Sequence, residues 1–463
     1  MNEEFRKEKD VLGEVNVPKD AYWGVSTQRA INNFQISKKR FPSSFLVALA
    51  KVKKACLLAN HDLNLIEKAK GKAILQAINE IIEEKKYLDQ FPVDVFQAGS
   101  GTSTHMNMNE VLAHRANEIL GHARGKNAPV HPNDHVNRGQ SSNDVIPTAM
   151  HLSILETLHR NLLPVLRNLI THLQEKIDEF EGIVKVGRTH LQDAVPIPLS
   201  MEFKVYKQQL EMSEHRIEEA SEELYAIPLG GTAVGTGITA HEDFAERAIS
   251  HLSNLTEYPF KQNTVKAEGI ASHNRVVHVH DVLKQLALAL MKMANDIRWM
   301  GSGPRAGLGE LTLPANELGS SIMPGKINPT QSEALIQVCL QVLGNTTTIS
   351  FAEPYGSLLD LNVSKPIMIV NVLNSIEMLA NSMQSFGKRC LNGLEVEKEE
   401  IEAQLKRNLM RVTNLAPVIG YDTAADIAQK AYREKKNLIE VINEMDLENK
   451  EKLRTLLDPS KMV

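Results

Sequence analysis

The sequence predicts a mostly α-helical protein with more than one domain. Its clearest evidence is an apolar stripe with steps of three and four residues, made of Leu155, Leu158, Leu162, Leu166, Leu169, Leu173, Ile177 and Phe180. Seven steps over 25 residues give a period of about 3.6, which is that of an α-helix. At 463 residues the chain also exceeds one typical core, so two or three domains are expected. Strand signals are scarce.

Other helices follow from apolar periodicity and from the positions of glycine and proline. Residues 1–40 read as an extended polar lead-in, and a helical region over 43–84 is expected to break at Gly71. Pro164 lies inside the apolar stripe and predicts a kink rather than an end, because the stripe continues past it. Further helices are expected at 111–120, 199–225, 275–300, 330–352 and 366–387, followed by a charged helical region over 390–463.

Composition excludes several classes of protein. A hydrophobic content of 42%, a charged content of 24% and a net charge of −5 are typical of a soluble globular protein. They argue against a partner bound through nucleic-acid phosphates. The charged N-terminus is not a signal peptide, and we find no run of about eighteen apolar residues, so no membrane span is expected. Cys56, Cys339 and Cys390 are an odd number inside expected helices, which favours reduced, buried thiols and a cytoplasmic location.

Polar loops between the expected helices carry the chemistry. They are rich in Ser, Thr, Asn and His, and one contains a lone lysine; they cover residues 97–110, 131–144, 186–194 and 319–329. Convergent hydroxyl, amide and ammonium donors bind anions, and a small carboxylate fits them best. Loops also serve as plain connections, and for 319–329 alone that reading has about even odds.

Other site types fail on spacing. Gly319 and Gly325 enclose five residues where a phosphate-binding P-loop has four, and Ile327 follows the lysine where Ser or Thr is needed. The glycine-rich segment 229–237 follows an expected helix and lacks the context of a dinucleotide site. Neither a metal-binding histidine pair nor a Gly-x-Ser-x-Gly motif is present. We therefore expect no metal and no nucleophilic serine of the hydrolase type.

Residues 319–329, GSSIMPGKINP, resemble the signature of the fumarase/aspartase superfamily of lyases. The continuation TQSEAL at 330–335 is similar to the class II fumarases, whereas aspartases usually continue with Pro-Val. Further motifs agree in the same order along the chain: GSGTST at 99–104, HPNDHVN at 131–137, QSSND at 140–144, GRTHLQDA at 187–194 and NVSKP at 362–366. The resemblance covers essentially the whole chain.

The resemblance implies a three-domain, mostly α-helical homotetramer. Its domains would cover residues 1–140, 141–390 and 391–463, and the long helices of the central domains would form one bundle. Each active site would take loops from three subunits. The implied reaction is the reversible hydration of fumarate to (S)-malate in the tricarboxylic acid cycle, through an aci-carboxylate dianion and without a metal or organic cofactor.

The resemblance also implies roles for single residues. Ser320 would remove the carbon-bound proton, helped by Lys326 and by backbone amides, and His190 would act as the acid or orient the water. Glu333 would set the charge of His190, although Thr330-x-x-Glu333 also fits a helix capping box. The two substrate carboxylates would be held by Lys326 together with Ser100, Thr102, Ser141, Ser142, Asn143, Thr189 and Asn328. A second anion site would comprise His131, Asn133 and Asp134, which otherwise form a simple turn.

Three departures and two rivals accompany this interpretation. His105 stands where many fumarases have Asn, Arg138-Gly139 replaces a more usual pair, and Ser200-Met201-Glu202 replaces Gly-Gln-Glu. The sequence Thr-Ser-Thr at 102–104 is slightly more similar to that of aspartases, so aspartate ammonia-lyase is one rival. A helical structural protein that kept the fold and lost activity is the other.

Overall fold

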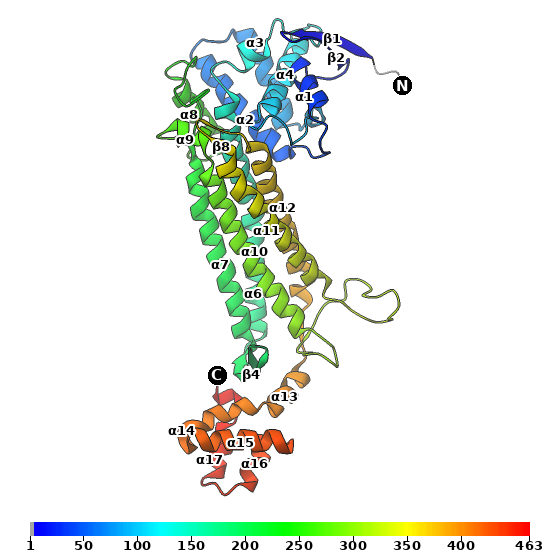
Figure 1. Cartoon of the computed structure of the whole chain (residues 1–463), viewed down its shortest axis with the longest axis vertical. Helices are drawn as coiled ribbons and strands as arrows, with labels where there is room; N and C mark the ends of the chain where they lie inside the picture. Colours follow the sequence, from blue (N-terminus) through cyan, green and yellow to red (C-terminus); the bar gives the residue numbers. More distant parts are fainter. Residues whose placement is uncertain (1–3) are drawn as a thin grey trace. The chain divides into compact units, whose positions relative to one another are not determined.

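The computed structural model describes residues 4–463, so the first three residues of the expected lead-in lie outside the described part. The mostly α-helical fold is confirmed, and Figure 1 labels its elements. Four long helices agree with the predicted ranges to within a few residues: α7 (Leu199–Glu222), α10 (Asn274–Met300), α11 (Thr330–Gly356) and α12 (Lys365–Arg389).

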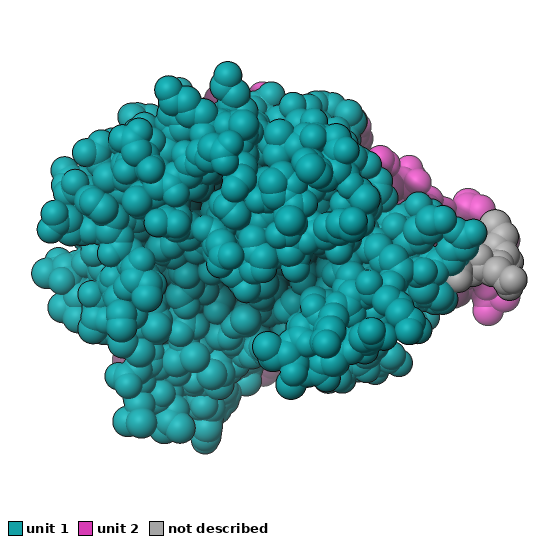
Figure 2. Space-filling model, turned by 90° about the horizontal axis from the view of Figure 1, so that it is seen from above, with its two compact units in different colours: residues 1–163, 215–285, 340–378 teal, residues 164–214, 286–339, 379–463 magenta. Residues whose placement is uncertain are grey.

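The chain divides into two compact units, coloured separately in Figure 2. Unit 1 comprises residues 1–163, 215–285 and 340–378, and unit 2 comprises 164–214, 286–339 and 379–463. The long helices α7, α10, α11 and α12 contribute residues to both units. The three-domain division implied by the resemblance partitions the chain differently and stays a prediction.

Unit 1 contains a hairpin and a set of helices that precede and follow the first polar loops. Its elements are β1 (Phe5–Asp10), β2 (Gly13–Pro18), α1 (Val25–Asn33), α2 (Ser43–Asp62), α3 (Lys68–Ile82), α4 (Thr102–Ile119), α5 (Ser142–Thr157), β5 (Ala226–Ile227), α8 (Phe244–Thr256), β6 (Lys261–Gln262), α9 (Lys266–Ala271), β8 (Ser357–Leu358) and β9 (Leu361–Asn362). A buried polar cluster joins its parts of α10, α11 and α12. In it His280 Nε2 lies 2.9 Å from Ser375 Oγ, and Asn345 donates to the same oxygen at 2.9 Å.

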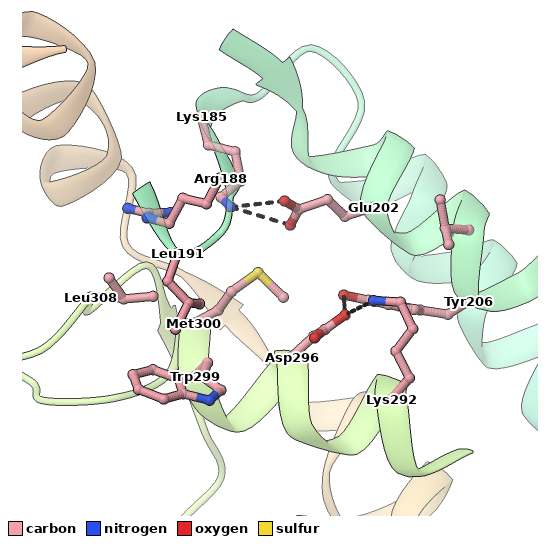
Figure 3. A pocket seen from close by; sticks show the side chains of 11 residues that line it. Lys185, Arg188, Leu191, Glu202, Tyr206, Lys292, Asp296, Trp299, Met300 and Leu308 are labelled. Atoms are coloured by element: carbon pink, nitrogen blue, oxygen red, sulfur yellow. Dashed lines mark hydrogen bonds and ion pairs between the residues drawn. The ribbon is translucent and has the colours of Figure 1, made fainter. Parts of the chain in front are cut away.

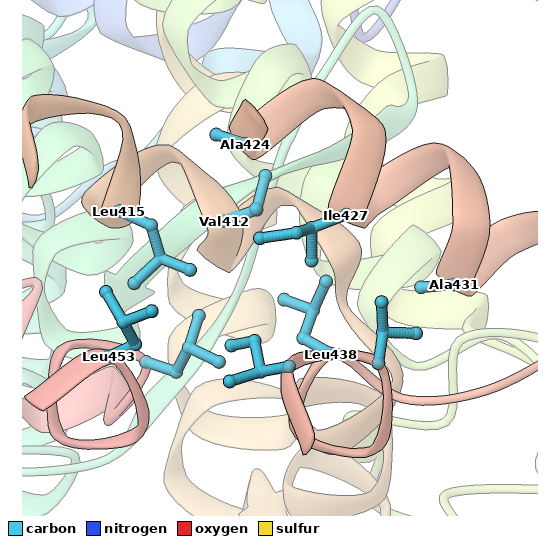
Figure 4. Close-up of a cluster of buried hydrophobic side chains, with 10 residues drawn as sticks. Val412, Leu415, Ala424, Ile427, Ala431, Leu438 and Leu453 are labelled. Carbon is cyan, nitrogen blue, oxygen red and sulfur yellow. The ribbon is translucent and has the colours of Figure 1, made fainter. Parts of the chain in front are cut away.

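Unit 2 contains a second hairpin and the C-terminal helices. Its elements are α6 (Leu163–Glu179), β3 (Val184–Thr189), β4 (Gln192–Pro198), β7 (Leu311–Thr312), β10 (Glu395–Val396), α13 (Lys398–Arg407), α14 (Ala416–Ile419), α15 (Tyr421–Glu434), α16 (Leu438–Glu444) and α17 (Lys450–Leu456). The C-terminal helices enclose their own apolar cluster, which includes Val412, Leu415, Ile427, Leu438 and Leu453 (Figure 4). This agrees with the predicted helical C-terminal region.

The predicted apolar stripe is buried along its whole length, from Leu155 to Phe180. The helix does not end at Pro164, as predicted: a π-helical turn at Leu158–Leu162 lies just before the proline, and α6 continues past it. Proline cannot donate a hydrogen bond to the carbonyl four residues earlier, because it lacks the N–H, and its ring crowds the preceding turn. A wider turn removes that conflict.

Two predictions for the first 84 residues were wrong. The break in the 43–84 region lies between α2 and α3, at residues 63–67, where Asn64 adopts a φ of +56°. Gly71 is instead buried inside α3, since packing outweighs the helix cost of glycine. The lead-in forms the β1–β2 hairpin and α1 rather than an extended segment.

Two polar segments read as loops are regular structure. The helix expected from residue 111 already begins at Thr102, and segment 186–194 forms most of the antiparallel hairpin β3–β4. In α4, polar side chains on the buried face hide the apolar period on which the prediction rests. In the hairpin, most residues around the turn are polar and exposed, so no alternation marks the strands.

The three cysteines are free and buried, as predicted. One helix, α11, is long and apolar enough to cross a membrane by length and composition alone, which differs from the expectation that no such stretch exists. One third of its most apolar window is buried in the described chain. Core helices of soluble proteins pass the same test.

Candidate active site

The predicted carboxylate ligands of unit 1 gather where two helices begin. We call Ser100, Thr102, Ser141, Ser142 and Asn143 the hydroxyl cluster. The hydroxyl of Thr102, the first residue of α4, lies 2.6 Å from Ser100 Oγ and 2.7 Å from Ser142 Oγ, which belongs to the first residue of α5. Asn143 donates to the Ala233 carbonyl at 2.8 Å. The structure thus brings these five predicted residues together.

The hydroxyl cluster has the electrostatics of an anion site. Helices α4 and α5 are 18 and 16 residues long, and the N–H groups of a helix's first turn carry a partial positive charge. Two such ends meet at Thr102 and Ser142. A carboxylate placed there would receive hydroxyl and N–H donors from both helices.

A buried carboxylate fixes the start of α5. Asp144 accepts from the backbone N–H of Ser141 at 2.9 Å, and its other oxygen accepts from Gly230 and Thr232 at 2.9 and 3.0 Å. Burial raises its pKa to about 6, against the effect of these N–H donors. The glycine-rich loop predicted at 229–237 therefore serves to hold α5 in place.

The predicted second anion site forms a compact turn. His131 Nδ1 accepts from the backbone N–H of Asn133 and Asp134 at 3.1 and 3.3 Å. Asn133 and Asp134 also line an open cavity of about 750 Å³ together with Arg138 and His241. The three predicted residues are adjacent and form the turn, and their role as a second anion site stays a prediction.

In unit 2, Ser320 lies in a loop between β7 and α11. Its Oγ accepts from the backbone N–H of Ile322 and Met323 at 3.2 and 3.0 Å. The loop closes through Gly319 N–H, which donates to the Lys326 carbonyl at 3.0 Å, and through Asn328, which donates to the Gly319 carbonyl at 2.7 Å. A Cβ at Gly319 would lie 2.3 Å from that carbonyl oxygen of Lys326, so only glycine permits the closure.

His190 lies at the tip of the β3–β4 hairpin and is exposed, as is Thr189. His190 and Leu191 form a two-residue turn with φ of +57° and +59°, the values of a type I′ turn, which matches the twist of a hairpin. Histidine tolerates this region better than branched residues do. The hairpin therefore places His190 at an exposed turn.

A buried ion network anchors that hairpin. Lys185 pairs with Glu202 at 3.0 Å, as Figure 3 shows, and with the fully buried Glu310 at 3.1 Å. Arg188 pairs with Glu310 at 2.6 Å and donates to Gln404 at 2.7 Å. These contacts from β3 to α7 and α13 hold the hairpin below His190. The sequence did not predict these ion pairs, because only the motif GRTHLQDA at 187–194 indicated a site in this region.

Lys326, Asn328 and Glu333 line one open cavity of about 450 Å³, which also includes Arg298 from the last turn of α10. Arg298 is a second cation that the sequence analysis did not identify. Within the described residues, Glu333 forms neither a hydrogen bond to Thr330 nor an ion pair with His190. Its N–H bonds the Pro329 carbonyl, so Thr330 is already the first helical residue rather than the cap.

Comparison with known proteins agrees with these motifs. A lyase family model matches residues 13–344, and the model of the fumarase C C-terminus matches residues 412–463. Fumarate hydratase class II of Thermosynechococcus vestitus is 50% identical over 96% of this chain and 95% of its own length. The corresponding protein of Nitrosomonas europaea is 47% identical over 99% of both chains. The crystal structure of class II fumarase from Schistosoma mansoni has a TM-score of 0.96 at 39% identity, over 99% of both chains.

Proposed function

The chain belongs to the class II fumarate hydratase family of lyases and hydrates fumarate to malate, and we propose how its residues perform this reaction. The product is (S)-malate, the step belongs to the tricarboxylic acid cycle, and the reaction needs no metal or organic cofactor. The hydroxyl cluster at the joined starts of α4 and α5 carries the proposal. It is a carboxylate site built from donors of two helix ends.

Ser320 is the proposed base for the proton on carbon. Two backbone N–H groups already point at its Oγ, and donors of this kind favour the anionic form of the hydroxyl. Lys326, at the neck of the same loop, adds a positive charge for the alkoxide and for the aci-carboxylate. Asn328 and Thr189 complete the contacts to the second carboxylate.

His190 is the proposed partner acid, which in the hydration direction orients the water. General acid and base groups contribute roughly 10²–10⁴-fold each. Glu333 is the proposed orienting carboxylate. The pairing of Glu333 with His190 belongs to the assembled enzyme, where the loops near 100, 140, 190 and 320 come from three subunits. His131, Asn133 and Asp134 form the proposed second anion site.

A cytoplasmic homotetramer is the proposed assembly. Helix α11 supports it, because within unit 1 its outward face carries no charge and exposes Leu340, Phe351 and Tyr355 by 56%, 57% and 82%. Exposed apolar patches on a helix mark protein contacts. In unit 2 the loop around Ser320 likewise exposes Leu318 and Ile322 by 90% and 83%. Sedimentation of the purified protein measures the number of subunits directly, and a monomer with full activity would contradict the shared site.

The reaction is tested by following the loss of fumarate absorbance with the purified protein, in chelator-treated buffer, beside an ammonia-release assay on aspartate. We expect fumarate hydration and no ammonia. Ammonia release without hydration would assign the chain to aspartate ammonia-lyase. Absence of both activities would favour the structural protein that lost catalysis.

A further inference from the structure

A lysine is enclosed behind the hydroxyl cluster. Lys53, on the inner face of α2, is only 1% exposed. Its ammonium group donates to Asn137 Oδ1 at 3.1 Å and to Gln140 Oε1 at 2.9 Å. Both acceptors lie in the segment that leads directly into Ser141 and α5. Lysine is almost never buried without partners, because its charge loses hydration, so these contacts hold the segment firmly.

The same ammonium group also reaches α4. Lys53 Nζ lies 3.2 Å from Nε2 of His105, which is in the first turn of α4, and that nitrogen lies 2.6 Å from Asn137 Oδ1. The amide of Asn137 donates to the Gln140 carbonyl, so its Oδ1 is an acceptor and His105 Nε2 carries the hydrogen. Asn137 Oδ1 therefore accepts from both Lys53 Nζ and His105 Nε2, and this shared acceptor connects the charged lysine to α4. Loss of one proton from Lys53 would remove the positive charge behind the hydroxyl cluster.

Lys53 gains or loses its proton near neutral pH. Burial lowers the pKa of Lys53 to about 7 and moves the pKa of His105 well below its ordinary value. Asp144 from α5, whose pKa burial raises to about 6, is the carboxylate that favours the charged form of Lys53. The buried thiol of Cys56, with its pKa raised to about 12, stays neutral. Helices α3 and α8 also pack against α2 and contribute no further group among the described residues.

We propose that Lys53 is a positioning residue for the substrate: it ties the start of α4 to the segment leading into α5, and its protonated form strengthens dicarboxylate binding at the hydroxyl cluster. The proposal rests on the proposed function, since it takes this cluster as the dicarboxylate site. By reciprocity, a bound dianion that gains affinity from the proton must also raise the lysine's affinity for that proton.

Succinate, an unreactive dicarboxylate, tests this by calorimetry between about pH 6.5 and 9, a range that spans the titration of Lys53. We expect the wild-type affinity to fall about tenfold with rising pH, which corresponds to a ligand-linked shift of about one pKa unit. Lys53→Met, never charged, is expected to bind weakly with a flat profile. Lys53→Arg, always charged, is expected to bind with a flat profile and without the loss at high pH.

Lys176→Met is the matched control. Lys176 is a buried lysine that donates to Glu179 and to the Leu394 carbonyl, away from every proposed site residue, so its variant should keep the wild-type profile. The proposal is overturned if wild-type affinity does not change with pH, or if either folded Lys53 variant keeps the wild-type slope. Fumarate hydration is measured on the same wild-type sample. The proposed function predicts hydration whether or not succinate affinity depends on pH, so failure of the Lys53 proposal is distinguished from failure of the proposed function.

Discussion

The two groups of site residues are held in opposite ways. The hydroxyl cluster of unit 1 sits on the first turns of α4 and α5, and its side chains bond one another. In unit 2, Ser320 and Lys326 lie on a loop without regular structure, and His190 lies on the exposed tip of a hairpin. The proposed carboxylate ligands of unit 1 are thus fixed to one another, whereas the proposed proton-transfer groups of unit 2 lie on a loop and a hairpin tip that are anchored at their bases.

The difference shows which contacts fix the geometry of each group. In the hydroxyl cluster the proposed ligands bond one another, so removing one side chain should weaken substrate binding and leave kcat little changed. Around Ser320 and His190 the geometry depends on the supports, namely the Gly319–Lys326 closure and the ion network at Glu310. Deletions there should weaken the chemistry or the support and leave binding nearly intact. Four substitutions test this division.

Ser320→Ala should have the largest effect. It removes the proposed base, so we expect kcat to fall by roughly 10⁴-fold with succinate affinity within a factor of about three of wild type, since the hydroxyl cluster is unchanged. Steady-state kinetics and calorimetry measure the two quantities. Ser321→Ala, a change at the exposed neighbour, should retain activity. Turnover equal to wild type in Ser320→Ala would remove the loop from the chemistry.

Glu310→Gln should cost the most stability. It leaves Lys185 and Arg188 with an uncharged partner in a buried site, and breaking a buried ion pair costs about 3–5 kcal/mol. Denaturant unfolding of the variant measures this loss. Exposed Glu219, paired with His215 on α7, provides the control, because Glu219→Gln should change stability by less than about 1 kcal/mol. Equal stability of the two variants would show that the hairpin has no buried anchor.

His190→Asn should reduce kcat by roughly 10²-fold, because it removes the proposed acid. Asparagine also tolerates a positive φ, so the turn is expected to persist. Kinetics beside the exposed variant His215→Asn measure the specific loss. If His190→Asn keeps the wild-type kcat, the hairpin tip has no part in the reaction.

Thr102→Val should have the smallest effect and act on binding. It deletes the hydroxyl shared by Ser100 and Ser142, so we expect KM to rise about tenfold, the cost of one hydrogen bond to a charged group, with kcat little changed. Thr455→Val, at an exposed position of α17, makes the same change away from the cluster and should leave KM unchanged. A fall in kcat with unchanged KM would erase the distinction between the two groups.

Much of the fold follows from apolar periodicity alone. The stripe from Leu155 to Phe180 and the helices α7, α10, α11 and α12 are the clearest cases. Helix α4 shows where this fails. His105, Asn107 and Glu110 are polar and buried, and each bonds a partner distant in sequence, which no local pattern records.

The candidate site residues were predicted from the resemblance of motifs, and the structure adds their burial and their contacts with distant parts of the chain. Nothing in the sequence distinguishes Lys53 from its neighbours Lys51 and Lys54, yet it alone of the three is fully buried. The ion partners Arg188 and Glu310 are 122 residues apart. Contacts over such separations depend on the completed fold, so they lie beyond residue spacing.

Glu110 has a consequence for how the N-terminal segment can be altered. Its buried carboxylate, on α4, accepts from the backbone N–H groups of Gly24, Ser26 and Thr27 at 2.8–3.0 Å and from the Thr27 hydroxyl at 2.6 Å. Trimming the chain before α2 would strip this carboxylate of all these donors. The loss would destabilise α4, whose first residue is Thr102. A deletion far from the proposed substrate contacts would therefore weaken substrate binding.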